Sequence, residues 1–315
     1  MITGFLMMKS LERDPATDNV ARSTKSFLWR KYTSLFSFLL PAALLNFTVI
    51  SLYRELEQET VLKRLALLIF EIVPLNSTGL QGEYVIGISW YLSSMFIALA
   101  ILYPFCKKFR QGFSFIACPL LVVLCYGTLS HFYGSLAVNY QYVPETVLNT
   151  GILRAIGGCA LGCLLYEASR FTAGKQPTAV ARILFTLTEL GAFAYFLHVM
   201  HSRAKSAYEF VAIIAIFLFL WVGINGLSYT SYLWNAKWTK PLGIASTLIV
   251  LSHYGWVYYL KKVLGEGFQK TGDVWWYVLA VAGSCLLVYL CSLLLKLLFS
   301  AIKKIPLWKK EASDT

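Results

Sequence analysis

The chain has 315 residues, of which 57% are hydrophobic and 14% are charged, and its formal net charge is +12. Soluble domains carry about 25% charged residues, so this composition excludes an ordinary soluble fold. The basic residues lie in short clusters between apolar runs, which is typical of a polytopic membrane protein and argues against nucleic-acid binding.

Apolar runs long enough to cross a bilayer recur along the sequence. They predict an all-α, polytopic transmembrane helix bundle in a single domain over residues 1–315, ending in a short basic cytoplasmic tail at 301–315. The eight full spans are expected at roughly 34–53, 88–105, 113–131, 149–168, 181–200, 207–228, 241–260 and 274–300. The stretch 61–75 is apolar but short and carries Glu71, so we expect a re-entrant or interfacial helix there.

The basic residues also orient the bundle. If 61–75 does not span and residues 9–33 are cytoplasmic, the inside segments hold about twice as many Lys and Arg residues as the outside segments. If 61–75 did span, the basic segment 107–110 would move to the outside. The bias therefore favours eight spans with both termini cytoplasmic.

An ionisable residue within the bilayer needs a partner or a function, because a charge there is costly, and the candidates are Glu71, Arg154, Glu167, Glu189 and His253. Arg154 lies one turn into its span, and Gly158 and Gly162 follow on the same face, where small residues let another helix approach closely. We expect Arg154 to face the bundle interior; the alternative is an arginine that reaches the outer interface. His253 could act as a general base or hold a polar substrate, or it could be an interhelical hydrogen-bonding group.

The outer end of the span at 88–105 supplies further candidates. Ser89 and Trp90 open this span, and together with Glu71 they are candidate substrate-binding residues. Trp is also enriched at membrane interfaces, which is the alternative explanation for Trp90. Asn76 begins a glycosylation sequon that this topology places outside.

The remaining ionisable residues in or near spans have simpler explanations. Glu167 is expected to pair with Arg170, and a polar contact inside the bundle explains Glu189 as well as a functional role does. Interfacial location accounts for the histidines at span ends, which are His131, His198 and His201.

The seven cysteines lie in or beside apolar runs and form no CxxC pair or metal-ligand spacing. They are predicted to be reduced packing residues, with no disulfide and no metal site. Nucleotide-binding and hydrolase motifs such as GxGxxG and GxSxG are absent from the sequence, and we predict no tightly bound cofactor.

Several segments, in order, resemble the acyltransferase-3 family of polytopic membrane acyltransferases. The most specific is SWYLSSMFIALAILYPF at 89–105. The others are ITGFLMMKSL at 2–11, FLWRKYTSLFSFLLPAALL at 27–45, RAIGGCALGCLLY at 154–166 and PLGIASTLIVLSHYGWV at 241–257. The resemblance covers nearly the whole chain.

The resemblance implies a membrane O-acyltransferase. Such enzymes transfer an acyl group, usually acetyl, from cytoplasmic acyl-CoA to a hydroxyl of an exported or cell-surface glycan, so the implied setting is a bacterial cytoplasmic membrane. Acyl-CoA would be a co-substrate, and membrane lipids and the glycan would be the partners. The basic pair Arg30–Lys31 falls where the family has a basic entry to its third helix, and it could hold the donor's phosphates by charge. Arg154 and His253 would line an outer pocket with Ser89 and Trp90.

Family members resembling this chain have ten spans, and the first carries an Arg and a His regarded as essential. The eight spans expected here begin where the third would begin, so the resemblance implies an N-terminally incomplete chain. In a complete enzyme the first-helix His would be the base, and His253 would position the acceptor. Two alternatives stay open: a transporter or flippase of a lipid-linked sugar or small metabolite, and a non-catalytic remnant or scaffold.

Overall fold

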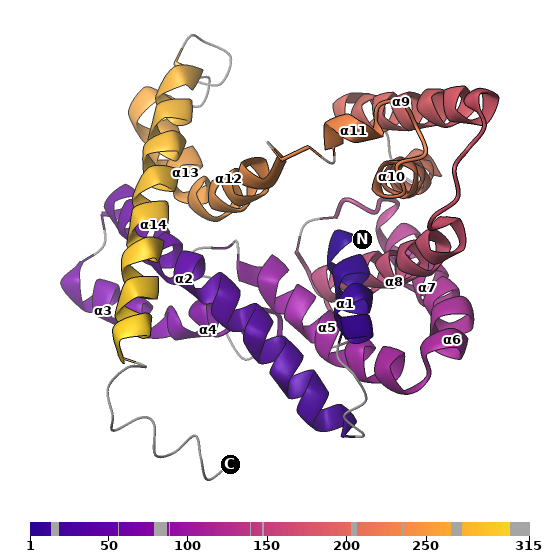
Figure 1. The fold of residues 1–315 in the computed structure, drawn as a ribbon. Coiled ribbons are helices and arrows are strands. Elements are labelled where there is room, and N and C mark those ends of the chain that lie inside the picture. The colour runs from indigo at the N-terminus through magenta and orange to yellow at the C-terminus, as the bar shows by residue number, and fades with distance from the viewer. Residues whose placement is uncertain are drawn as a thin grey trace. The chain divides into compact units, whose positions relative to one another are not determined.

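A computed structural model describes residues 1–13, 19–55, 57–78, 87, 89–138, 140–146, 148–202, 207–234, 236–237, 239–265 and 273–302. These residues form helices and no strand, which confirms the all-α prediction (Figure 1). The chain divides into two compact units: unit 1 comprises Met1–Leu28 and Tyr91–Thr239, and unit 2 comprises Trp29–Trp90 and Lys240–Thr315. The expected single domain stays a prediction, and most of the expected tail, 303–315, lies outside the described residues.

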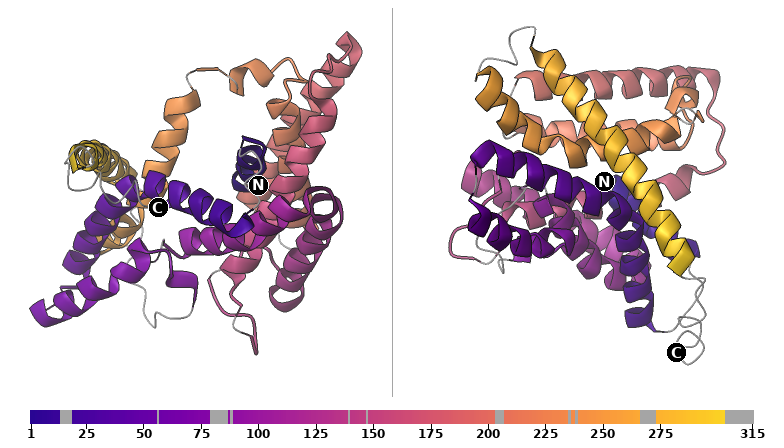
Figure 2. Two further views of the ribbon diagram at one scale, coloured as in Figure 1. Left: turned by 60° about the horizontal axis from the view of Figure 1, so that its bottom comes forward. Right: turned by 90° about the vertical axis from the view of Figure 1, so that its left-hand side faces the viewer.

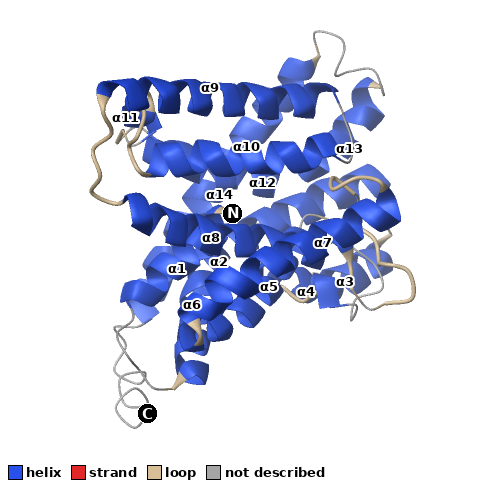
Figure 3. Cartoon of the chain, turned by 90° about the vertical axis from the view of Figure 1, so that its right-hand side faces the viewer, coloured by secondary structure: helices blue, strands red, loops and turns tan. Residues whose placement is uncertain are grey.

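Unit 1 contains α1 (Ile2–Arg13), most of α5 (Ser89–Lys108), α6 (Arg110–Gly112), η2 (Phe113–Ala117), α7 (Cys118–Tyr133), α8 (Thr150–Thr172), α9 (Ala179–Ser202), α10 (Ala207–Ile224) and α11 (Ser231–Trp234). Helix α7 packs along α8, α9 lies beside α10, and α1 packs on α8 (Figure 3). Buried Cys106, Cys118 and Cys163 contribute to the core of this unit.

Glycines bring α1 and α8 into close contact. A Cβ atom on Gly4 would overlap the backbone of Cys159, and one on Gly162 would overlap the backbone of Met1 and Phe5. The prediction that a helix approaches closely at Gly162 is therefore confirmed, and the approaching helix is α1.

Ion pairs join three segments at one end of unit 1. Arg170 Nη1 lies 3.3 Å from Glu167 Oε2, as predicted, and Arg110 Nε lies 3.1 Å from Glu167 Oε1. Glu12 also pairs with both arginines, and it accepts a hydrogen bond from the Tyr166 hydroxyl. Arg110, just after α5, and Arg170, in the last turn of α8, therefore lie at the same end of this unit, as the predicted topology requires.

Unit 2 contains most of α2 (Val20–Arg54), α3 (Gln58–Leu67), α4 (Ile69–Ile72), η1 (Asn76–Thr78), α12 (Thr239–Ser252), α13 (Tyr254–Leu264) and α14 (Val274–Ile302). The long helix α14 contacts α2, where Lys296 lies over the Phe38 ring at 4.4 Å and Phe299 meets Phe36 (Figure 2). This contact gives the cation within α14 an aromatic partner.

The short segment 61–75 lies along α2. Its Leu68 packs with Ala43, Phe47 and Ile50, and the Tyr32 hydroxyl donates to the Ile72 carbonyl at 3.3 Å. The segment forms only the short helices α3 and α4, and its re-entrant or interfacial position stays a prediction.

Seven helices in the described part of the chain are long and apolar enough to cross a membrane. They correspond to seven of the eight expected spans, and α2 starts at Val20, well before residue 34. Asn19 explains this early start, since its Oδ1 accepts from Arg22 N at 3.0 Å as a helix N-cap does. The expectation of one continuous span at 241–260 is wrong, because the helix is interrupted at His253 between α12 and α13.

Candidate functional site

A buried polar network lies where α4, η1 and the start of α5 meet. The Ser89 hydroxyl donates to Glu71 Oε2 at 2.8 Å and accepts from Asn76 Nδ2 at 2.6 Å. All three side chains are at most 1% exposed. A carboxylate, a hydroxyl and an amide are thus held together away from solvent, where such hydrogen bonds are strong and costly to break.

A second contact fixes the same junction. The Ser77 hydroxyl donates to the Trp90 carbonyl at 2.8 Å, so η1 is tied to the first turn of α5 at two adjacent residues. The structure therefore brings together Glu71, Ser89 and Trp90, the three candidate substrate-binding residues. Asn76 is buried in this network and its side chain is not presented for glycosylation.

Helix α13 borders this junction through a glycine. Gly87 has φ +67°, which favours glycine, and a Cβ atom there would lie 2.6 Å from the Tyr254 hydroxyl. Tyr254 directly follows His253, and it also packs against the α2 and α3–α4 core. The chain leading into α5 and the start of α13 are consequently neighbours in unit 2.

His253 occupies the interruption between α12 and α13. Its Nδ1 lies 3.1 Å from the Ile249 carbonyl and 2.9 Å from the Val250 carbonyl. Carbonyl oxygens only accept, so Nδ1 carries a hydrogen and Nε2 of the neutral ring is an acceptor. The sequence predicted that His253 could be a base or a hydrogen-bonding group, and this geometry suits either role.

The basic pair Arg30–Lys31 lies on α2 next to this region. Arg30 is exposed and Lys31 is partly exposed. They directly precede Tyr32, whose hydroxyl bonds to the carbonyl of Ile72, the residue after Glu71. Their proposed role in holding a phosphate-bearing donor stays a prediction.

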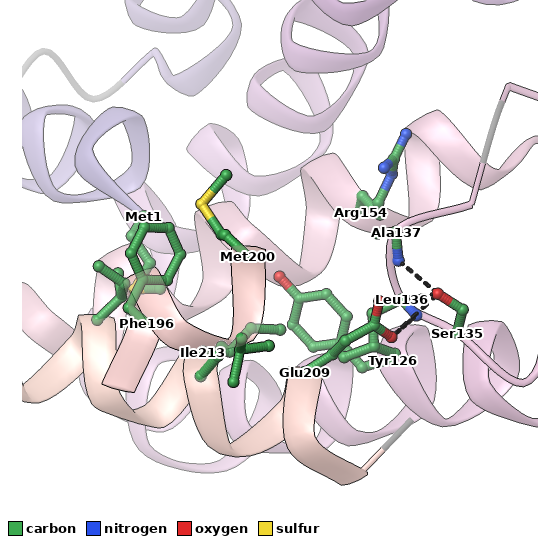
Figure 4. A pocket seen from close by; sticks show the side chains of 13 residues that line it. Met1, Tyr126, Ser135, Leu136, Ala137, Arg154, Phe196, Met200, Glu209 and Ile213 are labelled. Carbon is green, nitrogen blue, oxygen red and sulfur yellow. Dashed lines mark hydrogen bonds between the residues drawn. The ribbon is translucent and has the colours of Figure 1, made fainter. Parts of the chain in front are cut away.

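Unit 1 contains a cavity of about 560 Å³ that includes Arg154 (Figure 4). Its walls come from α7, α8, α9, α10 and the loop at 135–137, and the residues are Met1, Tyr126, Ser135, Leu136, Ala137, Arg154, Phe196, Val199, Met200, Glu209, Ala212, Ile213 and Ile216. Most of the lining is apolar, and its polar side chains are those of Arg154, Tyr126, Ser135 and Glu209.

Glu209 shapes the polar side of this cavity. Its carboxylate accepts from the Leu136 amide at 2.6 Å and from the Ser135 hydroxyl at 2.8 Å, which fixes the loop between α7 and α8 against the first turn of α10. Arg154 is among the residues that line this cavity, and its interior-facing role stays a prediction. It belongs to unit 1 and His253 to unit 2, so their predicted sharing of one cavity stays a prediction.

Glu189 makes the polar contact that the sequence left open. It is fully buried, and one carboxylate oxygen accepts from the Ser228 and Thr230 hydroxyls in the segment between α10 and α11. The remaining histidines lie near helix ends, as predicted: His131 in the last turns of α7, and His198 and His201 near the end of α9.

Three residues at these sites were missed from sequence: Tyr254, Glu209, and Asn46 on α2, whose side chain hydrogen-bonds to the Leu251 carbonyl and the Gly255 amide on either side of His253. Asn46 is a polar residue inside a span, which is a usable signal for an interhelical contact. Tyr254 and Glu209 gave no such signal, because aromatic and acidic residues near the ends of spans are common.

Comparison with known proteins identifies the family. The model of the acyltransferase-3 family, described as an acyltransferase domain, matches residues 1–293 and so covers both units. No curated protein and no solved structure matches the chain. With its apolar helices, the chain is an integral, multi-pass membrane protein. It belongs to the acyltransferase-3 family of membrane acyltransferases.

Proposed function

We propose that this protein transfers an acyl group, most simply acetyl, from cytoplasmic acyl-CoA to a hydroxyl of an exported or cell-surface glycan. Membership of the family supports acyl transfer in general. The donor, the acetyl group and the glycan acceptor are the proposed part, together with a bacterial cytoplasmic membrane and cytoplasmic termini.

The proposal rests on one observation: unit 2 contains, close together, the polar side chains that could take part in acyl transfer. The Glu71–Ser89–Asn76 network lies beside α13, which starts one residue after His253. The contact between Tyr32 and Ile72 links the Arg30–Lys31 pair to the same region. A basic surface for the donor's phosphates and a buried polar centre for the transferred group thus belong to one compact unit.

In the transfer step, the acceptor oxygen attacks the thioester carbonyl carbon. A carbon–oxygen bond forms, the carbon–sulfur bond breaks, the hydroxyl proton leaves to a base, and coenzyme A departs as the thiol once its sulfur is protonated. His253 holds the acceptor hydroxyl through Nε2, which orients the oxygen for attack. The Asn76 amide donates one hydrogen to Ser89 and has a second to offer at the buried centre, where charge develops on the carbonyl oxygen.

The unit 1 cavity suits part of the acceptor. Arg154 and Tyr126 can donate hydrogen bonds to sugar hydroxyls, while the apolar wall can cover the less polar face of a sugar ring. This assigns Arg154 a substrate-holding and charge-stabilising role on the outer side of the membrane.

The test uses membrane vesicles that contain the full chain, acetyl-CoA with a labelled acetyl group, and an envelope glycan fraction. The expected result is alkali-labile label in the glycan together with equimolar release of free coenzyme A thiol. His253→Ala should abolish transfer, whereas Tyr289→Phe, a conservative change at a partly exposed site on α14, should leave it unchanged. Vesicles that never label a glycan would count against the proposal.

A transporter is the alternative function, because transporters often bind their substrates at interrupted helices such as α12–α13. The family match favours acyl transfer. Uptake of a sugar or metabolite into vesicles without any acyl donor would favour the transporter instead.

A further inference from the structure

The interruption at His253 contains a side chain from another helix. In a continuous α-helix, the Gly255 amide would donate to the Leu251 carbonyl four residues earlier. Here the Gly255 amide donates to Asn46 Oδ1 at 2.9 Å, and Asn46 Nδ2 donates to the Leu251 carbonyl at 2.7 Å. The Asn46 carboxamide has therefore inserted itself into a single backbone hydrogen bond.

Asn46 fits this position closely. It is 1% exposed on α2, and Nδ2 also donates to the Ala42 carbonyl at 2.8 Å, so both amide hydrogens and the oxygen are engaged. A Cβ atom on Gly255 would lie 3.2 Å from Asn46 Oδ1 and 3.2 Å from Val49 Cβ, so glycine permits the close approach. Inside a membrane, freed backbone groups must find partners in the protein, and Asn46 supplies both.

We propose that Asn46 is a positioning residue: its carboxamide holds the α12–α13 helix open at Leu251–Gly255 and thereby fixes the His253 ring with Nδ1 on the backbone and Nε2 free to accept. Insertion of a side chain into the hydrogen-bond ladder is a known cause of helix kinks. The role of Asn46 in catalysis rests on the proposed function, whereas its hold on the helix does not.

The link from Asn46 to His253 runs through the carbonyls at the interruption. The His253 ring hydrogen-bonds to the Ile249 and Val250 carbonyls, directly before the Leu251 carbonyl that Asn46 binds. If the helix closed, the Leu251 carbonyl would return to the Gly255 amide and the Val250 carbonyl would be claimed by the Tyr254 amide. The ring would then share the Val250 carbonyl with a backbone amide, as it already shares the Ile249 carbonyl with the His253 amide, and the hydrogen would be held less firmly on Nδ1.

The test compares Asn46→Leu, which keeps the side-chain volume and removes both hydrogen-bonding groups, with Ser37→Ala. Ser37 is a matched control, because it is buried on the same helix and its hydroxyl has no hydrogen-bond partner in the described part of the chain. The readout is the ¹⁵N spectrum of histidine-labelled protein in lipid nanodiscs, which is tractable because the chain has four histidines.

In the wild type and in Ser37→Ala, His253 should show the Nδ1–H tautomer. In Asn46→Leu it should show a mixture with the Nε2–H tautomer, and transfer should fall about 10- to 100-fold in kcat, as misplacement of a reacting group does. If Asn46→Leu does not fold, Gly255→Ala should shift the same signals to a smaller extent, since its methyl group presses on Asn46 Oδ1.

A His253 spectrum that is unchanged in folded Asn46→Leu, or in Gly255→Ala if only that variant folds, would overturn the proposal. The spectrum needs no turnover, so the two proposals fail separately. If Asn46→Leu changes the tautomer but the wild type shows no detectable transfer, the Asn46 role stands and the proposed function falls. If Asn46→Leu loses the transfer that the wild type shows while its tautomer is unchanged, the proposed function stands and the Asn46 role falls.

Discussion

Replacing Ser89 by alanine tests whether the buried network holds the start of α5. The change removes a hydroxyl that donates to Glu71 Oε2 and accepts from Asn76 Nδ2, and all three side chains are at most 1% exposed. The loss of a partner for the buried Asn76 amide costs about 1–3 kcal/mol, and the loss of one hydrogen bond to the Glu71 carboxylate costs about 1.5–3 kcal/mol. Together these losses predict that the free energy of unfolding falls by about 2–6 kcal/mol.

The assay is reversible unfolding in mixed micelles, following helix content against the mole fraction of denaturing detergent. Ser51→Ala is the matched control, because the Ser51 hydroxyl is buried with no hydrogen-bond partner among the described residues, so its removal should be neutral or stabilising. Glu71→Gln keeps a carbonyl oxygen that can accept from Ser89, so it should cost less than Ser89→Ala. Equal effects of Ser89→Ala and Ser51→Ala would refute the reasoning.

Three further predictions concern unit 1. Gly162→Ala should destabilise the protein by about 1–3 kcal/mol, because its methyl group would overlap the α1 backbone. Gly191→Ala should not destabilise it, because the space around Gly191 is open. Unfolding in denaturing detergent measures the stability of both variants. The hydrogen bond from Tyr166 lowers the pKa of Glu12 below its ordinary value of 4.5, so this contact stabilises the fold above that pH and the stabilisation is lost on acidification. In Glu12→Gln, the free energy of unfolding should therefore fall less steeply as the pH is lowered. An unchanged acid dependence would contradict this. Arg154→Gln should raise KM for the acceptor more than it lowers kcat, while Leu187→Met, at an exposed position on α9 outside the cavity lining, should change neither.

The helices were predictable because a bilayer span has a strong and simple signature. Long apolar runs fixed the positions of seven helices, and Gly158 and Gly162 predicted a close helix approach on α8. The short segment at 61–75 was also recognised, since its length and its charges do not suit a span. Each of these predictions depends on neighbours in sequence.

The features that the sequence did not predict depend on residues that are close in space but far apart in the chain. Hydropathy predicted one span at 241–260, because every residue around His253 is compatible with a continuous helix. The interruption requires Asn46, which is about 205 residues away in sequence, and no local pattern connects the two. Asn76 was similarly classed as a surface sequon, although its amide completes the network with Ser89.

Irregular backbone in unit 2 coincides with the candidate chemistry. The polar groups of an interrupted helix must be satisfied within the protein, and at the α12–α13 interruption Asn46 satisfies them. Asn46 binds the Leu251 carbonyl, and the His253 ring bonds to the Val250 carbonyl directly before it. The side chain that stabilises this interruption therefore also orients a residue assigned to the reaction, so variants at Asn46 should change reactivity and local helix structure together.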